Sequence, residues 1–204
     1  MSDFDGKAAT WDQDPMKVER AVTVGRAIAG SVPVEGRSIL EYGCGTGLLG
    51  FALQPAAGHV TLADTSAGML EVLRGKIAAT GAANMASLRL DLLADPLPEG
   101  RFDLVCSLMT LHHIPDTPGI LRKFHEVLAP GGWVALSDLD AEDGSFHGED
   151  VADVHRGFDR KTLGGQLETA GFRDVRFATV FEIHRETAAG PRRFTVFLAL
   201  GRKD

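Results

Sequence analysis

Residues 39–47 read Ile-Leu-Glu-Tyr-Gly-Cys-Gly-Thr-Gly, and this stretch decides the fold. A short apolar run ends at Glu41, glycines follow at positions 43, 45 and 47, and an apolar helical pattern begins at Leu48. A strand that breaks into glycines and re-enters as a helix brings bare backbone close to a ligand. The sequence therefore predicts a nucleotide-type cofactor site at the tip of a strand.

Two interpretations of this loop compete. Gly45-Thr-Gly47-Leu-Leu-Gly50 satisfies the pattern G-x-G-x-x-G, which is typical of NAD-dependent oxidoreductases. However, a carboxylate at Glu41, close before the glycines, repels a pyrophosphate and attracts a cation. S-adenosylmethionine carries a sulfonium and an ammonium group and no phosphate, so the acid at the strand tip favours that cofactor.

The pattern Glu41-x-Gly43-x-Gly45-x-Gly47 resembles motif I of the class I S-adenosylmethionine-dependent methyltransferases. The resemblance implies a Rossmann-like methyltransferase fold, S-adenosylmethionine as methyl donor and S-adenosylhomocysteine as product. It extends from about residue 36 to the end of the chain, because the later segments also fit the family.

Apolar strand-like runs alternate with helical patterns along most of the chain, which indicates right-handed βαβ units in one parallel sheet. The expected strands are 38–42, 59–64, 87–92, 102–108 and 133–137, and the expected helices are 48–54, 66–80 and 118–129. A helix over 162–170 and a hairpin of strands 175–184 and 193–200 follow. We therefore expect an α/β fold with a doubly wound, seven-stranded sheet, mostly parallel, with an antiparallel C-terminal hairpin strand.

This organisation predicts a single methyltransferase domain over residues 1–204. Its parts are an N-terminal lid and helix (1–35), a cofactor-binding core (36–138), an acceptor-side insertion (139–160) and a C-terminal helix and hairpin (161–204). Asp14-Pro15 predicts the start of the first helix, with an N-cap followed by proline. The apolar residues Val18, Val22, Gly25 and Ile28 predict its buried face.

Composition narrows the class of substrate. The net charge of −7 argues against a nucleic-acid partner, because phosphate binding relies on Lys and Arg. No apolar run approaches the roughly 18 residues of a membrane span, and the acidic N-terminus has no signal-peptide core. Two cysteines, one in the glycine loop and one in a strand, indicate no disulfide framework, so we expect a cytoplasmic protein.

Several residues beyond the glycine loop are expected to hold the cofactor. Asp64 ends the second strand, where a carboxylate accepts the ribose hydroxyls. The family resemblance adds Met69 against the adenine, although a plain core methionine is the alternative, and Asp91 and the Leu92 amide on the adenine edge, with Asp95 as the rival acid. It also places Ser107 beside the methionine moiety. The expected cofactor-binding residues are Glu41, Gly43, Cys44, Gly45, Gly47, Asp64, Thr65, Met69, Asp91, Leu92 and Ser107.

The acceptor side is less defined. Leu111-His112-His113 follows the fourth strand, and many small-molecule methyltransferases carry a similar Leu-His-His, so one histidine is a candidate base. We choose His113, with packing under the loop as the alternative. His155 is a second candidate, in an acidic stretch that also holds His147 and that is either a substrate lid or a solvated loop. No metal is expected, because no tight metal-ligand spacing occurs there.

These features together predict transfer of a methyl group from S-adenosylmethionine to a small-molecule acceptor by in-line displacement. The alternatives are a non-catalytic protein that binds S-adenosylmethionine or S-adenosylhomocysteine, and an NAD-dependent oxidoreductase. The acceptor and the atom methylated are not defined by the sequence, because acceptor pockets in this fold are built from variable loops.

Overall fold

The computed structural model describes residues 4–146, 154–187 and 190–204. Within them one seven-stranded sheet has the order β3-β2-β1-β4-β5-β7-β6. Neighbouring strands among β1 to β5 pair in parallel, whereas β7 is antiparallel to both β5 and β6. The strands are β1 Ser38–Tyr42, β2 His59–Asp64, β3 Met85–Arg89, β4 Phe102–Leu108, β5 Leu128–Leu139, β6 Arg173–Thr187 and β7 Gly190–Arg202. The predicted fold class is confirmed.

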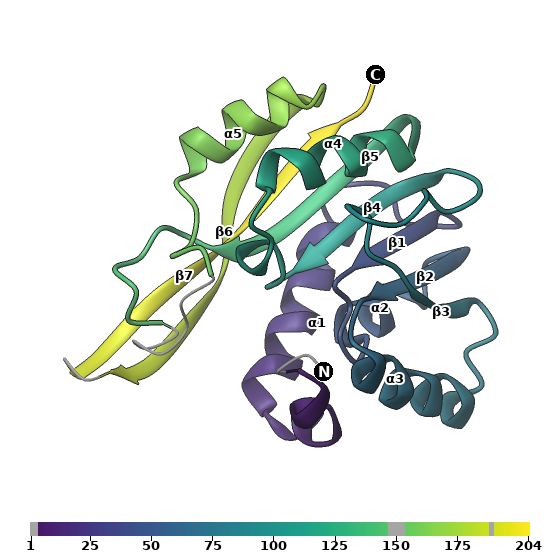
Figure 1. The fold of residues 1–204 in the computed structure, drawn as a ribbon, viewed down its shortest axis with the longest axis horizontal. Helices are drawn as coiled ribbons and strands as arrows, with labels where there is room; N and C mark the ends of the chain where they lie inside the picture. Colours follow the sequence, from purple (N-terminus) through teal and green to yellow (C-terminus); the bar gives the residue numbers. More distant parts are fainter. Residues whose placement is uncertain (1–3, 147–153, 188–189) are drawn as a thin grey trace.

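Helices cover both faces of the sheet, as Figure 1 shows. One core lies between the sheet and α1, α2 and α3, and the other lies between the sheet and α4 and α5. These helices are α1 Pro15–Ala29, α2 Leu48–Leu53, α3 Ala67–Thr80, α4 Thr117–Val127 and α5 Arg160–Thr169. The described chain also has two 3₁₀ helices. η1 Asp5–Gln13 precedes α1, and η2 Leu111–His113 follows β4.

The strand order reverses between β1 and β4, which are adjacent in the sheet. The chain leaves β1 toward α2 on one face and leaves β4 toward α4 on the other. Ligands in open parallel sheets bind in the crevice beyond the carboxyl ends of strands at such a reversal. The glycine loop after β1 and η2 after β4 both lie at this point.

Three local predictions were wrong. The third strand ends at Arg89 and not at Leu92, because its pairing with β2 stops where β2 stops, at Asp64. The fifth strand begins earlier than predicted because Leu128 pairs with Phe102 of β4, and the hairpin strands run longer because β6 and β7 pair with each other well beyond the apolar runs. The hairpin extends past the rest of the sheet (Figure 1).

The buried face of α1 is also rotated from its predicted position. Asp14 caps this helix as expected, accepting from the backbone N–H of Met16 at 3.0 Å. Gly25 and Ile28 are buried as predicted, but Val18 and Val22 are only half-buried. The remaining buried positions belong to Arg20, Ala21 and Val24.

In the described part of the chain, none of the helices is long and apolar enough to cross a membrane.

Candidate functional site

Four backbone amides of the glycine loop donate hydrogen bonds to other groups of the protein. The N–H groups of Gly43 and Cys44 donate to the Ala63 carbonyl at 2.8 and 3.0 Å, and that of Gly47 donates to the Cys44 carbonyl at 2.8 Å. The N–H of Gly45 donates to a carboxylate oxygen of Asp64 at 2.7 Å. A pyrophosphate binds such a loop through its free amides. These four amides are therefore not available to bind a pyrophosphate.

Glu41 places a second carboxyl group beneath the loop. Its side chain is 2% exposed, it accepts a hydrogen bond from the backbone N–H of Gly50 in α2, and its Oε2 has no partner among the described residues. Burial raises the pKa of Glu41 to about 8, and the charge of nearby Asp64 adds to this shift while Lys76 opposes it. Glu41 therefore keeps its proton at neutral pH, and it is the Asp64 carboxylate and the occupied amides that make this end of the crevice suitable for a cation rather than an anion.

The loop glycines have different surroundings. A Cβ atom on Gly43 would lie 2.0 Å from Thr110 Cγ2, and one on Gly47 would lie 2.7 Å from Leu73 Cδ1, so both are required by packing within the protein. A Cβ on Gly45 would meet only Met69 Sδ and Trp11 Nε1, at 3.9 and 4.0 Å. Of these three glycines, Gly45 is therefore the one that borders open space.

Asp64 and Met69 both lie next to Gly45. The Oδ1 atom of Asp64 accepts from the Ser66 amide at 2.8 Å, while its Oδ2 holds Gly45. Each carboxylate oxygen accepts more than one hydrogen bond, so the group keeps capacity for ribose hydroxyls. Met69 is buried in α3 with its sulfur toward Gly45, whereas Thr65 is exposed.

The predicted adenine-edge residues follow β3 rather than end it. The Oδ1 atom of Asp91 accepts from the Leu93 amide at 2.9 Å, and the Asp91 amide donates to Asp95 at 2.9 Å. The amide of buried Leu92 donates to the hydroxyl of Tyr42 at 3.4 Å. Asp95, the alternative adenine-binding acid, thus stabilises the turn that contains Asp91. The Leu92 amide, which was expected to bind the adenine ring, donates to Tyr42 instead.

Two further predicted residues have structural partners. The hydroxyl of Ser107 donates to the carbonyl oxygen of Tyr42 at 2.9 Å, which ties the ends of β4 and β1 together. Burial raises the pKa of the Cys44 thiol well above its usual value. A thiol held neutral is a poor nucleophile, which agrees with a role for Cys44 as a small residue in a tight loop.

The segment η1 lies across the cofactor end of the crevice. Asp12 accepts from the Thr46 hydroxyl at 2.5 Å and from Lys76 Nζ at 2.6 Å. At the other end of η1, Asp5 accepts from the Ser66 hydroxyl at 2.6 Å and from the Gly68 amide at 3.0 Å. Between these two tethers the indole of Trp11 faces Gly45.

On the acceptor side, the structure pairs a buried carboxylate with His112. Nδ1 of His112 lies 2.7 Å from Oδ1 of Asp138, and the His112 amide donates to Oδ2 at 3.2 Å. The two residues are 2% and 0% exposed. His113, the histidine chosen from the sequence, instead packs edge-to-face with Phe4 at 5.1 Å and lies 4.1 Å from the His112 ring.

His155 connects two loops of the same region. Its Nε2 lies 3.0 Å from the Ile114 carbonyl, and its amide donates to the His112 carbonyl at 2.8 Å. The ring therefore holds the segment after β5 against η2. His147 lies outside the described residues, as do Glu149, Asp150 and Asp153, so the structure describes only part of the 139–160 insertion. Within the described ranges, no group of three or more metal-ligating side chains occurs.

Comparison with known proteins decides the family. A family model described as a methyltransferase domain matches residues 39–132. The aklanonic acid methyltransferase DauC of Streptomyces sp. (strain C5) is 31% identical over 150 residues, covering 70% of this chain and 66% of that protein. This chain belongs to the class I S-adenosylmethionine-dependent methyltransferases. S-adenosylmethionine is the cofactor of that family.

Other relatives agree with this methyltransferase assignment. The ubiquinone biosynthesis O-methyltransferase of Pseudomonas aeruginosa (strain UCBPP-PA14) is 33% identical over 106 residues, which cover 52% of this chain. The chain spans 45% of the length of that relative. A S-adenosylmethionine-dependent methyltransferase structure from Aquifex aeolicus superposes with a TM-score of 0.69 at 20% identity, covering 94% of this chain and 99% of that one. That likeness shows the shared fold.

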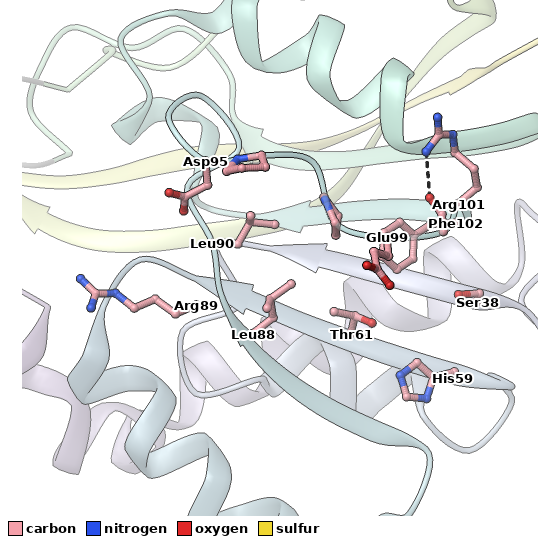
Figure 2. A pocket seen from close by; sticks show the side chains of 13 residues that line it. Ser38, His59, Thr61, Leu88, Arg89, Leu90, Asp95, Glu99, Arg101 and Phe102 are labelled. Carbon is pink, nitrogen blue, oxygen red and sulfur yellow. Dashed lines mark hydrogen bonds between the residues drawn. The ribbon is translucent and has the colours of Figure 1, made fainter.

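A hollow of about 660 Å³ elsewhere in this methyltransferase is not the cofactor site (Figure 2). Its walls include Ser38, His59 and Phe102 at the amino ends of β1, β2 and β4, and the loop 95–101. The described chain segment that connects β3 to β4 contains no helix. Ligands of parallel sheets bind at the opposite, carboxyl ends of the strands, where Gly45 and His112 lie.

The methyltransferase site contains three features that the sequence analysis missed. Asp138 was counted only as one acid of the stretch after the fifth strand, although a carboxylate at the carboxyl end of a buried strand was a usable signal. The tether from Asp12 to Lys76 joins residues 64 positions apart and has no local signature. The sequence analysis did not consider Arg20, which the fold buries to 8% exposure.

Proposed function

We propose that the chain transfers the methyl group of S-adenosylmethionine to a hydroxyl group of a small-molecule acceptor. The single observation that carries the choice of cofactor is the state of the glycine loop. Four of its amides donate within the protein, the Asp64 carboxylate lies beside it, and the Glu41 carboxyl group under it is protonated at neutral pH. A sulfonium and an ammonium group suit these surroundings, whereas a pyrophosphate does not.

The chain's own residues position the two reactants. Bound S-adenosylmethionine supplies an activated methyl group, so alignment is the main contribution of the protein; alignment can supply roughly 7–11 kcal/mol. In this account Asp64 accepts the ribose hydroxyls, Asp91 holds the adenine edge, and Gly45 and Met69 border the adenosyl group. The segment η1, tethered through Asp5 and Asp12, covers this end and excludes water.

We assign the role of general base to His112. Because Asp138 accepts a hydrogen bond from Nδ1, it fixes the tautomer in which Nε2 carries the lone pair. The Asp138 carboxylate also accepts from the amides of His112 and Leu139, so it is held rigidly. A hydroxyl acceptor must lose its proton during methyl transfer, and a buried histidine oriented by a carboxylate is suited to take it.

The relatives support a small-molecule acceptor. The names of two of them, a ubiquinone biosynthesis O-methyltransferase and an aklanonic acid methyltransferase, refer to small molecules. The negative net charge favours the same class, because phosphate binding relies on Lys and Arg. Both cysteines are free and buried, on which we base the proposal of a reducing, cytoplasmic location.

An assay with labelled S-adenosylmethionine tests this function. The protein is incubated with the labelled donor and a library of phenols, hydroxy acids and hydroxyquinones, and labelled products are separated from the donor. We expect transfer to at least one hydroxyl compound, and transfer at a rate at least about 10²-fold lower in a His112→Gln control. Binding of the donor without transfer to any compound would indicate a non-catalytic binding protein and would refute the proposal.

A further inference from the structure

A third apolar cluster lies apart from the two cores that flank the sheet. Its buried members come from the end of β5, the segment after it and the hairpin of β6 and β7: Leu139, Phe146, Ile183, Phe194 and Val196. Three further apolar side chains, Met16, Met109 and Phe181, pack against them and stay partly exposed. These three are the members of the cluster that a ligand can reach.

The cluster is connected to the proposed base by two of its residues. Leu139 directly follows Asp138, the carboxylate that is paired with His112. Met109 comes immediately after β4, and its N–H donates to the Ser137 carbonyl of β5 at 2.8 Å. In the described part of the chain, no side chain that faces the glycine loop is a member of the cluster. The cluster therefore belongs to the acceptor side of the site.

The backbone of Met109 has a conformation that is unusual for its residue type. Its φ is +54°, in the left-handed region that residues with a side chain rarely occupy. Such strain persists only where the surrounding structure imposes it, and it is concentrated at ligand-binding and catalytic sites. Here the bond to Ser137 and the bond from the Thr110 hydroxyl to the Gly43 carbonyl, at 3.0 Å, fix the chain on both sides. The strained turn thus places a flexible, polarizable thioether against the cluster.

Two arginines of the hairpin hold the segment after β5 against the same cluster. Arg185 and Arg192 lie directly opposite each other on β6 and β7, and such a pair of like charges by itself destabilises a sheet. Arg192 forms an ion pair with Asp143 at 2.7 Å. Arg185 donates to the carbonyl oxygen of Phe146, and its guanidinium lies 4.8 Å from the centre of the Phe146 ring. The hairpin thus fixes both the backbone and the ring of Phe146.

We propose that an aromatic ring of the methyl acceptor binds against Met16, Met109 and Phe181, and that Arg185 is a positioning residue that keeps Phe146 in the wall of this site. The proposal rests on the methyltransferase function proposed above and names its class of substrate, an aromatic hydroxyl compound. Thioether groups make favourable contacts with aromatic rings, and methionine adapts its shape to the group that it meets. The phenyl ring of Phe181 offers a further edge or face for stacking.

The chemistry of a histidine base favours the same class of acceptor. A phenolic hydroxyl has a pKa of about 10, so it gives its proton to an imidazole far more easily than an aliphatic alcohol does. The phenolic oxygen bonds to the transferred methyl carbon, the electron pair of the broken carbon–sulfur bond stays on sulfur, and the hydroxyl proton goes to Nε2 of His112. No further reactant is needed.

The methyl signals of methionine test the proposal on the intact protein saturated with S-adenosylhomocysteine. The methionine methyl groups are labelled with carbon-13, each signal is assigned by replacing that methionine with leucine, and 2-naphthol is titrated in. We expect the ring current of 2-naphthol to shift the Met16 and Met109 signals in a saturable way. Met85, which is buried in the core on the side of α1 to α3, should not shift.

A saturated analogue separates aromatic binding from general apolar binding. Decahydro-2-naphthol has the carbon skeleton and the hydroxyl of 2-naphthol but no aromatic ring. It should bind about fivefold or more weakly, because the contacts specific to an aromatic ring are lost. If 2-naphthol moves neither the Met16 nor the Met109 signal, or if the saturated analogue binds as tightly, the proposal is wrong.

Matched arginines of the hairpin test the role of Arg185. Arg185→Gln should weaken 2-naphthol binding about fivefold or more, because Phe146 loses its cationic partner, and should leave the affinity for S-adenosylhomocysteine unchanged. Arg193→Gln removes an exposed arginine that pairs with Glu182 outside the cluster, and it should change neither affinity. Equal 2-naphthol affinity in the two variants would contradict the positioning role.

A variant of Met109 keeps the test decisive if Arg185→Gln fails to fold. Asparagine tolerates the left-handed backbone, so Met109→Asn should fold and bind S-adenosylhomocysteine as the wild type does. It should weaken 2-naphthol about fivefold or more, because a polar amide replaces the thioether. Unchanged affinity for 2-naphthol in this variant would overturn the proposal.

Two outcomes separate the aromatic site from the proposed methyl transfer. If the labelled donor transfers its methyl group only to aliphatic hydroxy acids, the methyltransferase function stands and the aromatic class of acceptor is wrong. If S-adenosylhomocysteine does not bind while 2-naphthol still shifts the Met16 and Met109 signals, the aromatic site stands and the proposed methyl transfer fails.

Discussion

The carboxyl group of Glu41 lies in the core with one oxygen unpaired, and its pKa is raised to about 8 from 4.5. Between these two values the unfolded chain holds a carboxylate while the folded chain keeps the proton. The folded state therefore binds more protons, and the free energy of unfolding falls as the pH rises from about 4.5 to 8. Glu41 thus lowers the stability of the protein at neutral pH.

Replacing Glu41 with Gln should remove this pH-dependent loss. At pH 8 the Glu41→Gln variant should be more stable than the wild type by up to about 4 kcal/mol, and the difference should vanish near pH 4.5. Urea denaturation at several pH values measures it. Glu35→Gln, which changes an exposed carboxylate, is the control and should show no such trend. A constant or inverted difference would show that Glu41 is ionised in the folded protein.

The pairing of His112 with Asp138 distinguishes it from the other two histidines of the acceptor end. His112→Gln should lower kcat by roughly 10²- to 10⁴-fold, the usual contribution of a general base, without changing the dissociation constant of S-adenosylmethionine. His113→Gln should have a smaller effect, because His113 packs against Phe4. Comparable kcat values in the His112 and His113 variants would remove His112 from the mechanism.

Some residues of the candidate site could be identified from the sequence and others could not. The acid, glycines and small residues of the loop were identifiable because they are consecutive and their chemistry depends on local backbone. His112 and Asp138 were not identified as a pair because 26 residues separate them and only the alignment of β4 with β5 brings them together. Arg20 was missed because the sequence gives no signal for a charge that the fold buries.

At the scale of elements, η1 is the segment whose position depends on few contacts. Asp12 links it to Thr46 and Lys76, and replacing this carboxylate with an amide, which removes the charge from both partly buried bonds, should cost about 1 kcal/mol. Asp12→Asn should therefore raise the rate of proteolysis within η1 about fivefold, and S-adenosylhomocysteine should slow cleavage in both forms. Asp103→Asn, at the opposite end of the strands, is the control. Equal cleavage rates in Asp12→Asn and wild type would show that the tether does not hold η1.

Elements were predicted well where local pattern decides them and poorly where pairing does. β1, β2 and β4 match their predicted ranges, because each is a short apolar run bounded by polar or glycine residues. β3 begins two residues and ends three residues earlier than predicted, which leaves Asp91 and Leu92 in a turn. Its range is set by pairing with β2, and pairing register is not written in the segment itself.

For the whole molecule, the alternation of strands and helices and the terminal hairpin were enough to predict the topology. These features constrain the fold because parallel connections are right-handed and a close pair of strands must be antiparallel. The sequence did not define how η1 and the 139–160 insertion meet the sheet. Those contacts depend on long-range hydrogen bonds such as Asp5 to Ser66 and the Asp140–Phe158 bridge.

Calorimetric titration of the intact protein with S-adenosylmethionine and with NAD distinguishes the two cofactors that the glycine loop could hold. We expect saturable one-to-one binding of S-adenosylmethionine and no heat of binding with NAD. Gly45→Val should lose this binding, because its side chain projects into the space assigned to the cofactor beside Met69 and Trp11; the φ of +52° at this position also strains valine, so circular dichroism must show that the variant is folded. Binding of NAD, or the absence of S-adenosylmethionine binding at saturating concentration, would contradict the account.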